Sequence, residues 1–293
     1  MITCKGRTEL LKMERATKIV QETLADCVAA CRPGVTTEEI DRIAADGIRR
    51  RGGKAAFPGY RGYPKTICSS VNEEVVHGIP TTKRRLRDGD IVGLDLGVIV
   101  DGYFGDAART AIVGDVQPAV RDLVTNTWRA LVAGVSAVRV GGRIGDIGAA
   151  VEAVAKAKGY GVVREYVGHG IGTALHEEPQ VPNYGPGGKG EIIREGMTLA
   201  IEPMFNLGTP KVRVSPDGWT VRTVDGKPSA HFEHTVVATI EGPIVLGFGR
   251  FSADGLVAGV PDETEYPIPA APPRGESAAP GQARAFLGEG FEA

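Results

Sequence analysis

The sequence has few cysteines, no excess of charge and no long hydrophobic run. Its four cysteines include no Cys-x-x-Cys pair, so a disulfide scaffold is not expected. Lys and Arg total 34 against 36 Asp and Glu, and this net charge of -2 gives no electrostatic reason to expect DNA or a membrane as a partner. The longest apolar run, Ile91 to Val100, is shorter than the ~20 residues that cross a bilayer and contains Asp95. Charged residues occur among the first dozen positions, so we expect no secretory signal and a cytoplasmic location.

Several catalytic signatures are absent as well. The chain has no Gly-x-Ser-x-Gly, no His-Glu-x-x-His and no Walker lysine loop, which excludes several common enzyme classes. Glycine is abundant, with 41 residues among 293, and the apolar fraction of 42% is enough for a sizeable core. The five histidines fall in short, turn-rich stretches rather than along the whole chain: His77, His169, His176, His231 and His234.

Apolar periodicity predicts an order of elements that occurs twice. Helices are expected over 9–31 and, after a Thr36/Glu39 capping box, up to Arg51. A second pair is expected at 118–138 and 144–158. Strands follow each pair, at 65–71 and 90–113, then near 161–167, 197–202, 211–214, 219–223 and 231–240. This repetition predicts two similar halves around a shared site within residues 1–250. Residues 251–293, rich in proline, alanine and glycine, are predicted to be a disordered tail.

Two aspartates in the predicted hairpin give the first indication of a site. Asp95 interrupts an apolar strand, where a lone buried carboxylate would be costly. If the hairpin turns at Asp101-Gly102, Gly97 lies opposite Asp106, and the two carboxylates project from one face as diagonal neighbours. Converging carboxylates repel each other unless a cation or proton lies between them. The alternative is that one or both are ordinary turn or edge aspartates.

Three further polar residues lie in or beside apolar strands. His169 is flanked by glycines, which leaves its ring nitrogens unobstructed. Glu202 ends a strand just before a proline, and Glu233 interrupts another strand. The alternatives are a turn histidine and a solvated strand end. Strand alternation places His231 on the face of Glu233 and His234 on the opposite face, where a structural role is expected.

Four carboxylates and one imidazole form a donor set for a hard or borderline divalent metal. Two divalent ions would balance the four negative charges, whereas one ion would leave excess negative charge in the core. A dinuclear site activates a shared water, which is hydrolase chemistry. We therefore predict two divalent metal ions in each chain, with Co, Mn, Fe and Zn all suited to these ligands.

Seven short motifs occur in a fixed order: Val76-His-Gly-Ile-Pro80, Leu94-Asp-Leu-Gly97, Gly105-Asp-Ala-Ala-Arg-Thr110, Gly168-His-Gly-Ile-Gly172, Leu175-His-Glu-Glu-Pro179, Ile201-Glu-Pro-Met204 and Phe232-Glu-His-Thr235. Together they resemble the type I methionine aminopeptidases over roughly residues 7–245. The resemblance implies the α+β pita-bread fold, in which antiparallel strands of two pseudo-symmetric halves enclose a dinuclear metal site and helices lie outside. Residues 1–250 would be the catalytic domain.

The resemblance also implies which residues hold the metals. One metal would be bound by Asp95, both would be bridged by Asp106 and Glu233, and the other would be completed by His169 and Glu202. The bridging hydroxide would attack the first peptide carbonyl of the substrate.

Catalytic and substrate-binding roles follow from the same resemblance. Glu202 would take a proton from the bridging water, His176 would donate to the substrate carbonyl or oxyanion, and His77 would contact the scissile amide. The implied methionine pocket contains Tyr60, Tyr63, Cys68 and Trp219. Three positions depart from the family pattern and bear on the shape of this pocket: Val76 where cysteine is common, Leu175 where an aromatic is common, and His231 where glutamine is common.

The expected enzyme removes the initiator methionine from nascent proteins that have a small second residue. It would act on N-terminal Met peptides as a monomer, with transient contact with the ribosome. One alternative is a proline-directed peptidase of the same fold, against which the chain length and the Val76–Pro80 segment argue. The other is a non-catalytic protein of this fold, which would be expected to have lost metal ligands.

Overall fold

Two helices begin the chain in the structure, a computed structural model that describes residues 2–248, 251–252 and 255–256. Helix α1 (Arg7–Ala30) turns Met13, Val20 and Leu24 into the core. Helix α2 (Thr37–Arg50) begins at the predicted capping box, because the Glu39 N–H donates to Thr36 Oγ1 at 3.2 Å and the Glu39 carboxylate accepts from the Thr36 N–H at 2.7 Å. Both predicted helices are confirmed.

The predicted hairpin is also confirmed, and with it the positions of its two aspartates. β4 (Ile91–Val100) pairs antiparallel with β5 (Tyr103–Ile112) through a turn in which Asp101 and Gly102 have φ values of 49° and 80°. Positive φ at both turn residues matches the right-handed twist of the flanking strands. Asp95 lies opposite Ala108 and Gly97 opposite Asp106, so both carboxylates lie on one face.

One nine-stranded sheet joins the two halves of the molecule. Its order is β1-β4-β5-β14-β9-β7-β8, with β2 added on β4 and β15 on β14. The remaining strands of this sheet are β1 (Lys54–Ala55), β2 (Cys68–Val71), β7 (Gly168–Gly170), β8 (Glu177–Val181), β9 (Thr198–Ile201), β14 (Glu233–Thr239) and β15 (Gly242–Val245). β14 is the seam: it pairs with β5 only at Glu233 and His234, and with β9 over 234–237.

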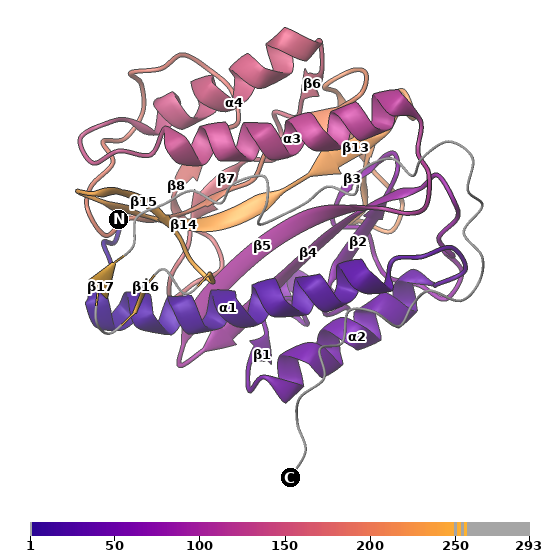
Figure 1. Cartoon of the computed structure of the whole chain (residues 1–293), viewed down its shortest axis with the longest axis horizontal. Helices are drawn as coiled ribbons and strands as arrows, with labels where there is room; N and C mark the ends of the chain where they lie inside the picture. Colours follow the sequence, from indigo (N-terminus) through magenta and orange to yellow (C-terminus); the bar gives the residue numbers. More distant parts are fainter. Residues whose placement is uncertain (1, 249–250, 253–254, 257–293) are drawn as a thin grey trace.

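The second half repeats the helix pair of the first. In Figure 1, α3 (Pro118–Ser136) and α4 (Ile144–Lys158) lie above the strands, and α1 and α2 lie below them. Each pair covers its own core: Leu24 and Leu94 belong to the first, and Trp128 and Val236 to the second. The predicted repetition of two helices followed by strands is therefore present. Two small sheets complete it, one with β10 (Met204–Asn206) between β13 (Ser229–His231) and β6 (Gly161–Val162), the other with β12 (Val221–Thr223) between β11 (Val212–Val214) and β3 (Glu74–Val76).

Several predicted strands differ from those observed. The strand expected at 161–167 is β6 followed, after a gap, by β7. The strand expected at 231–240 is broken at Phe232, where the chain passes from the small β13 sheet to the large sheet. β8 forms where a loop was expected, because Glu177–Val181 is an edge strand whose mostly polar sequence and Pro179 give no strand pattern.

The N-terminal segment is tied to the second half by a buried ion pair. Lys5 Nζ lies 2.6 Å from Glu177 Oε2, and the Lys5 side chain is almost fully buried. The Lys5 N–H also donates to the Gly196 carbonyl at 2.7 Å. Residues 2–6 therefore link the start of α1 to strand β8.

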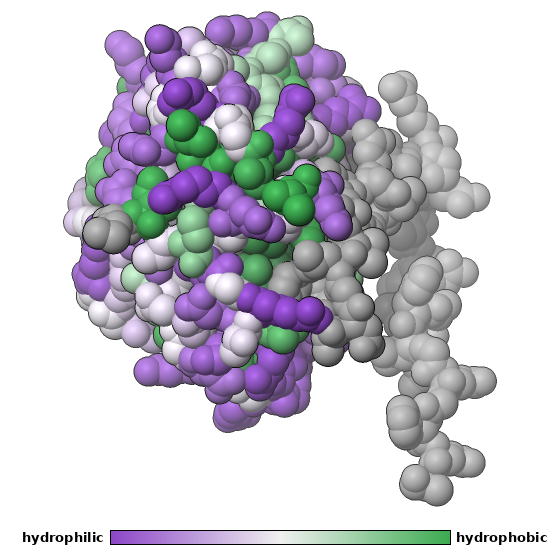
Figure 2. All heavy atoms as spheres, turned by 90° about the vertical axis from the view of Figure 1, so that its left-hand side faces the viewer, coloured by the Kyte–Doolittle hydropathy of each residue, from purple (hydrophilic) through white to green (hydrophobic). Residues whose placement is uncertain are grey.

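The surface is mainly polar, and no helix in the described part of the chain has the length and apolarity needed to cross a membrane. Figure 2 shows polar and charged residues over most of the face on the left of Figure 1, with apolar side chains gathered near its centre. Within the predicted tail, only β16 (Phe251–Ser252) and β17 (Gly255–Leu256) are described, and they pair with each other. The rest of the 251–293 prediction lies outside the described residues.

Candidate functional site

The hairpin supplies two of the predicted ligands. Asp95 and Asp106 project from β4 and β5 into one cavity, and Asp106 is 3% exposed. Gly97, opposite Asp106, is needed here because a Cβ at this position would lie 2.9 Å from the Phe57 ring and 3.0 Å from Ala56. The register of β4 and β5 presents both carboxylates to the same cavity, as predicted.

His169 reaches the same cavity from the second half. It lies on β7 between β8 and β9, and the glycines beside it serve this packing rather than access to the ring. A Cβ at Gly168 would lie 2.3 Å from the Ala200 carbonyl oxygen, and one at Gly170 would lie 2.3 Å from the Glu178 carbonyl oxygen. His169 Nδ1 lies 2.9 Å from the Gly170 carbonyl, which can only accept, so Nδ1 carries the proton and Nε2 keeps a free lone pair.

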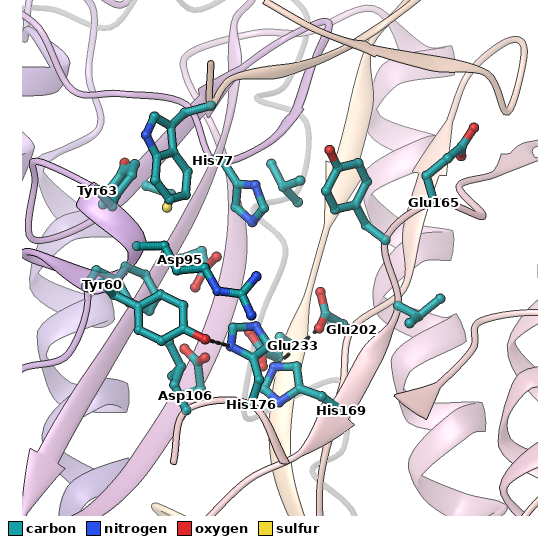
Figure 3. A pocket seen from close by; sticks show the side chains of 18 of the residues that line it. Tyr60, Tyr63, His77, Asp95, Asp106, Glu165, His169, His176, Glu202 and Glu233 are labelled. Carbon is teal, nitrogen blue, oxygen red and sulfur yellow. Dashed lines mark hydrogen bonds and ion pairs between the residues drawn. The ribbon is translucent and has the colours of Figure 1, made fainter. Parts of the chain in front are cut away.

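Glu202 and Glu233 complete the set from two adjacent strands. Glu202 follows β9, and its Oε1 lies 3.6 Å from His169 Nε2. The Asn183 side chain donates to the Glu202 backbone carbonyl at 3.0 Å, which holds the strand end in place. Glu233 begins β14 opposite Ala108. Figure 3 shows Asp95 and Asp106 on one side of the cavity and His169 and Glu202 on the other.

The electrostatics of this cavity favour a cation. Burial first, and then mutual repulsion, raise the pKa of Asp106 and Glu233 far above the usual range, and burial also raises the pKa values of Asp95 and Glu202. Burial lowers the pKa of His169 to about 3, so its ring is neutral and able to bind a metal. Ligand atoms of Asp106, His169 and Glu233 all lie within 4.8 Å of one another.

Unsatisfied carboxylate atoms test the fit of a metal independently. Asp95 Oδ1, Asp106 Oδ1 and Glu233 Oε1 are buried and have no hydrogen-bond partner among the described residues. Buried carboxylate oxygens without donors are costly unless a cation is available to them. The donor set of four carboxylates and one neutral imidazole therefore fits the divalent metal that the sequence predicted.

Two other predicted histidines border the cavity. His77 has a φ of 61°, a strained value for a non-glycine residue, and its ring packs edge-on against Tyr166 and Trp219. Burial, followed by the charges of other histidines, lowers the pKa of His77 to about 4. His176 lies on the accessible side of the cavity, with its ring centroid 4.1 Å from that of His169.

An apolar wall adjoins the predicted metal ligands. All four predicted pocket residues line the same cavity of about 350 Å³: Tyr60, Tyr63, Cys68 and Trp219. The Tyr63 hydroxyl lies within donating distance of the carbonyls of Ile67 and Gly78. Phe57 and Leu175 also line this wall. Sequence reasoning missed Phe57, although its place in the glycine-rich loop before Tyr60 was a usable signal.

His231, which strand alternation placed on the face of Glu233, lies at the site, and its contact with Glu202 was not predicted. Its Nε2 lies 3.7 Å from Glu202 Oε2 and is buried without a hydrogen-bond partner in the described part of the chain. The alternation that placed His231 on the face of Glu233 was the available signal. His234 points the other way, with its ring 5.6 Å from that of Trp128, as expected of a structural residue.

Comparisons with known proteins show what this chain is similar to. The model of metallopeptidase family M24 matches residues 11–240. A methionine aminopeptidase of Clostridium acetobutylicum is 46% identical over 246 residues, which cover 84% of this chain and 98% of that protein. A crystal structure of methionine aminopeptidase from Thermotoga maritima has a TM-score of 0.83 and 42% identity, covering 84% of this chain and 99% of that chain. Prolidase from Pyrococcus furiosus, at 22% identity and a TM-score of 0.68, covering 83% of this chain and 65% of that chain, shares the fold.

Proposed function

The chain belongs to metallopeptidase family M24, and we propose that it acts as a type I methionine aminopeptidase with the pita-bread fold. The enzyme removes methionine from the N-terminus of peptides and nascent proteins whose second residue is small. The observation that carries this proposal is the juxtaposition of five metal ligands with an apolar wall in one cavity. An N-terminal methionine requires a metal site near its first peptide bond and an apolar wall against which its thioether side chain can pack.

Enzymes of this family use divalent metal, and five residues of this chain would hold it: Asp95, Asp106, His169, Glu202 and Glu233. Two divalent ions fit the four carboxylates best, since they balance the charge that burial makes costly. When bound, such ions lower the pKa of a water and polarise the substrate carbonyl. Metal analysis of protein purified under anaerobic conditions tests the number and identity of the ions, with Co, Mn, Fe and Zn as the candidates.

The protein's own side chains have separate tasks in the reaction. Glu202, whose pKa is raised by burial, accepts a proton from the attacking water and passes it toward the leaving amine. His176, on the accessible side of the cavity, donates a hydrogen bond to the oxygen of the first peptide carbonyl. His77, held in a strained loop above the cavity, contacts the scissile amide. The apolar wall fixes the methionine side chain, so that the peptide bond lies over the ligands.

Peptide hydrolysis after metal addition tests the proposal. Metal-free protein should be inactive on Met-Ala-Ser, and one or more of Fe(II), Mn(II), Co(II) and Zn(II) should restore release of methionine under anaerobic conditions. An Xaa-Pro peptide series is the control for the proline-directed alternative. Cleavage of Xaa-Pro substrates in preference to Met-Ala-Ser would reject the proposed specificity and leave the family assignment in place. Absence of both activities with every metal would support the non-catalytic alternative.

We propose further that the enzyme acts in the cytoplasm as a monomer and meets nascent chains through transient contact with the ribosome. The support is the chemistry of the substrate, a nascent chain whose N-terminus becomes available as soon as it leaves the ribosome. Analytical ultracentrifugation should give the mass of one chain, 30.8 kDa. Co-sedimentation with ribosomes should be weak and should disappear at raised salt.

A further inference from the structure

The ring of His176 is held between two other rings. On one side the Tyr60 ring stacks on it with centroids 5.5 Å apart and planes inclined by 20°. On the other side lies His169, at 4.1 Å between centroids. Figure 3 shows His176 between the two, with the Tyr60 hydroxyl directed at its Nδ1, 2.8 Å away. The hydroxyl of Tyr60, a residue assigned to the methionine pocket, therefore reaches His176, which is proposed to donate to the substrate carbonyl.

The chemistry of this contact determines which nitrogen of His176 carries the proton. A neutral imidazole ring has one N–H, so one of its nitrogens donates and the other accepts. A phenol is a stronger acid than a neutral imidazole N–H, so the Tyr60 O–H donates and Nδ1 accepts. The proton of the imidazole then resides on Nε2, the nitrogen that is available to a substrate.

The backbone around Tyr60 is built to hold this arrangement. Tyr60 begins the short 3₁₀ turn η1 (Tyr60–Gly62), which follows Gly59 with a φ of 83°. Its N–H donates to the Phe57 carbonyl at 2.9 Å, and the Tyr63 N–H donates to the Tyr60 carbonyl at 2.9 Å. Tyr63, three residues later, has its own hydroxyl beside the carbonyls of Ile67 and Gly78. The hydroxyls of the two pocket tyrosines thus have different partners, and that of Tyr60 is the one bonded to His176.

We propose that Tyr60 is a positioning residue whose hydroxyl fixes His176 as the Nε2–H tautomer, so that His176 can donate to the substrate carbonyl. The inference rests on the proposed function for its kinetic part only. Without the hydroxyl, Nδ1 would have no donor, and the ring would be free to adopt the Nδ1–H form, which offers the substrate an acceptor in place of a donor.

Tyr60→Phe tests the proposal, because it removes one oxygen and keeps the stacked ring. In Zn(II)-loaded protein labelled with ¹⁵N in its histidine rings, the wild-type His176 nitrogens should show the Nε2–H pattern. Tyr60→Phe should shift them toward the Nδ1–H form or a mixture of the two. Tyr63→Phe is the matched control, since it removes a hydroxyl from the same wall and should leave the His176 tautomer unchanged. A His176 ring that already carries its proton on Nδ1 in the wild type would overturn the proposal.

Kinetics on Met-Ala-Ser provide the second measurement. Tyr60→Phe should lower kcat about 3- to 10-fold, the worth of one hydrogen bond, with KM changed by less than about twofold. In a His176→Ala background the same substitution should cost nothing further, because Tyr60 acts through His176. Two results would show that Tyr60 only binds methionine. One is a rise in KM at constant kcat, and the other is a loss of kcat in the His176→Ala background as large as in the wild type. The NMR result needs no turnover, so failure of the proposed function is distinguishable from failure of this proposal.

Discussion

The Glu202 carboxylate lies between two imidazoles, with His231 Nε2 on one oxygen at 3.7 Å and His169 Nε2 on the other at 3.6 Å. His169 is a predicted ligand, whereas His231 offers a nitrogen to the oxygen that His169 does not face. A polar group here keeps the Glu202 carboxylate from facing an apolar surface, where its pKa would rise further.

His231→Leu should therefore lower kcat by about tenfold, because the proton acceptor loses a polar neighbour worth ~1.4 kcal/mol. His231→Gln should stay within about threefold of the wild type, since glutamine keeps a polar side chain at that position. Metal content, measured on the same preparations, controls for loss of the site. Equal activity of the leucine and glutamine variants would show that His231 only fills space.

The proposed role of His176 predicts a loss of turnover without a loss of metal. His176→Ala leaves the five predicted ligands in place, so bound metal should remain near the wild-type amount. Turnover of Met-Ala-Ser should fall ~10²–10³-fold, the usual effect of removing one oxyanion donor. Metal analysis of the same preparations distinguishes the two roles of His176. A variant that has lost its metal would mean that His176 is a ligand.

The second residue of the substrate should be selected by size. The backbone of 168–172 and the segment from Pro64 to Ser70 border the space where this residue must lie, and Cys68 and His169 line the cavity. We expect kcat/KM on Met-Xaa-Ser peptides to fall with side-chain volume from Gly, Ala and Ser to Leu, Lys and Arg. Lysine and leucine, similar in volume but different in charge, form the control pair and should be cleaved with similar, low efficiency. Equal efficiency on Met-Ala and Met-Arg peptides would refute the steric explanation.

In the metal-free protein, stability should fall as pH rises from 5 to 8. In metal-free protein, burial and repulsion raise the pKa of Asp106 and Glu233, so the native state holds protons that the unfolded chain has released above ~pH 5. The native state then binds more protons than the unfolded state, and the free energy of unfolding falls as pH rises toward the raised pKa values. The melting temperature should fall between pH 5 and pH 8 and recover on addition of Mn(II).

Asp106→Asn provides the control for this pH effect. It removes one of the repelling charges at nearly constant shape. At pH 8 the variant should raise the melting temperature of the metal-free protein by about 3–8 °C, and the slope with pH should be shallower than in the wild type. A metal-free wild type whose melting temperature rises steadily from pH 5 to pH 8 would contradict the carboxylate explanation.

The proposed tail can be tested by truncation. The composition of the C-terminal stretch offers too little apolar area to offset the entropy of ordering it. Truncation after Leu256, which retains β16 and β17, should leave kcat/KM and the melting temperature within error of the full chain. Differential scanning calorimetry provides the measurement, and a fall of several degrees would show that the tail docks on the core.

Features that neighbouring residues in the sequence decide could be predicted, whereas features that depend on distant partners could not. The hairpin register, and with it Asp95 and Asp106, followed from one turn whose chemistry allows a single geometry. β8 could not be predicted, because its pairing with β7 is decided by a partner strand and not by its own polar sequence. The contact between Tyr60 and His176 joins residues 116 positions apart, and nothing in either loop indicates it.

The seam at β14 has a consequence for how the protein assembles. Asp95 and Asp106 are close in sequence, so the first half can bring them together by a local hairpin, whereas Glu233 arrives only when β14 pairs with β5 at two positions. A slip of one residue would direct His234 into the cavity and bury Glu233 beside Trp128. An ion held by Asp106 and Glu233 would therefore connect the two halves, and its uptake during refolding would report that they have paired in the correct register.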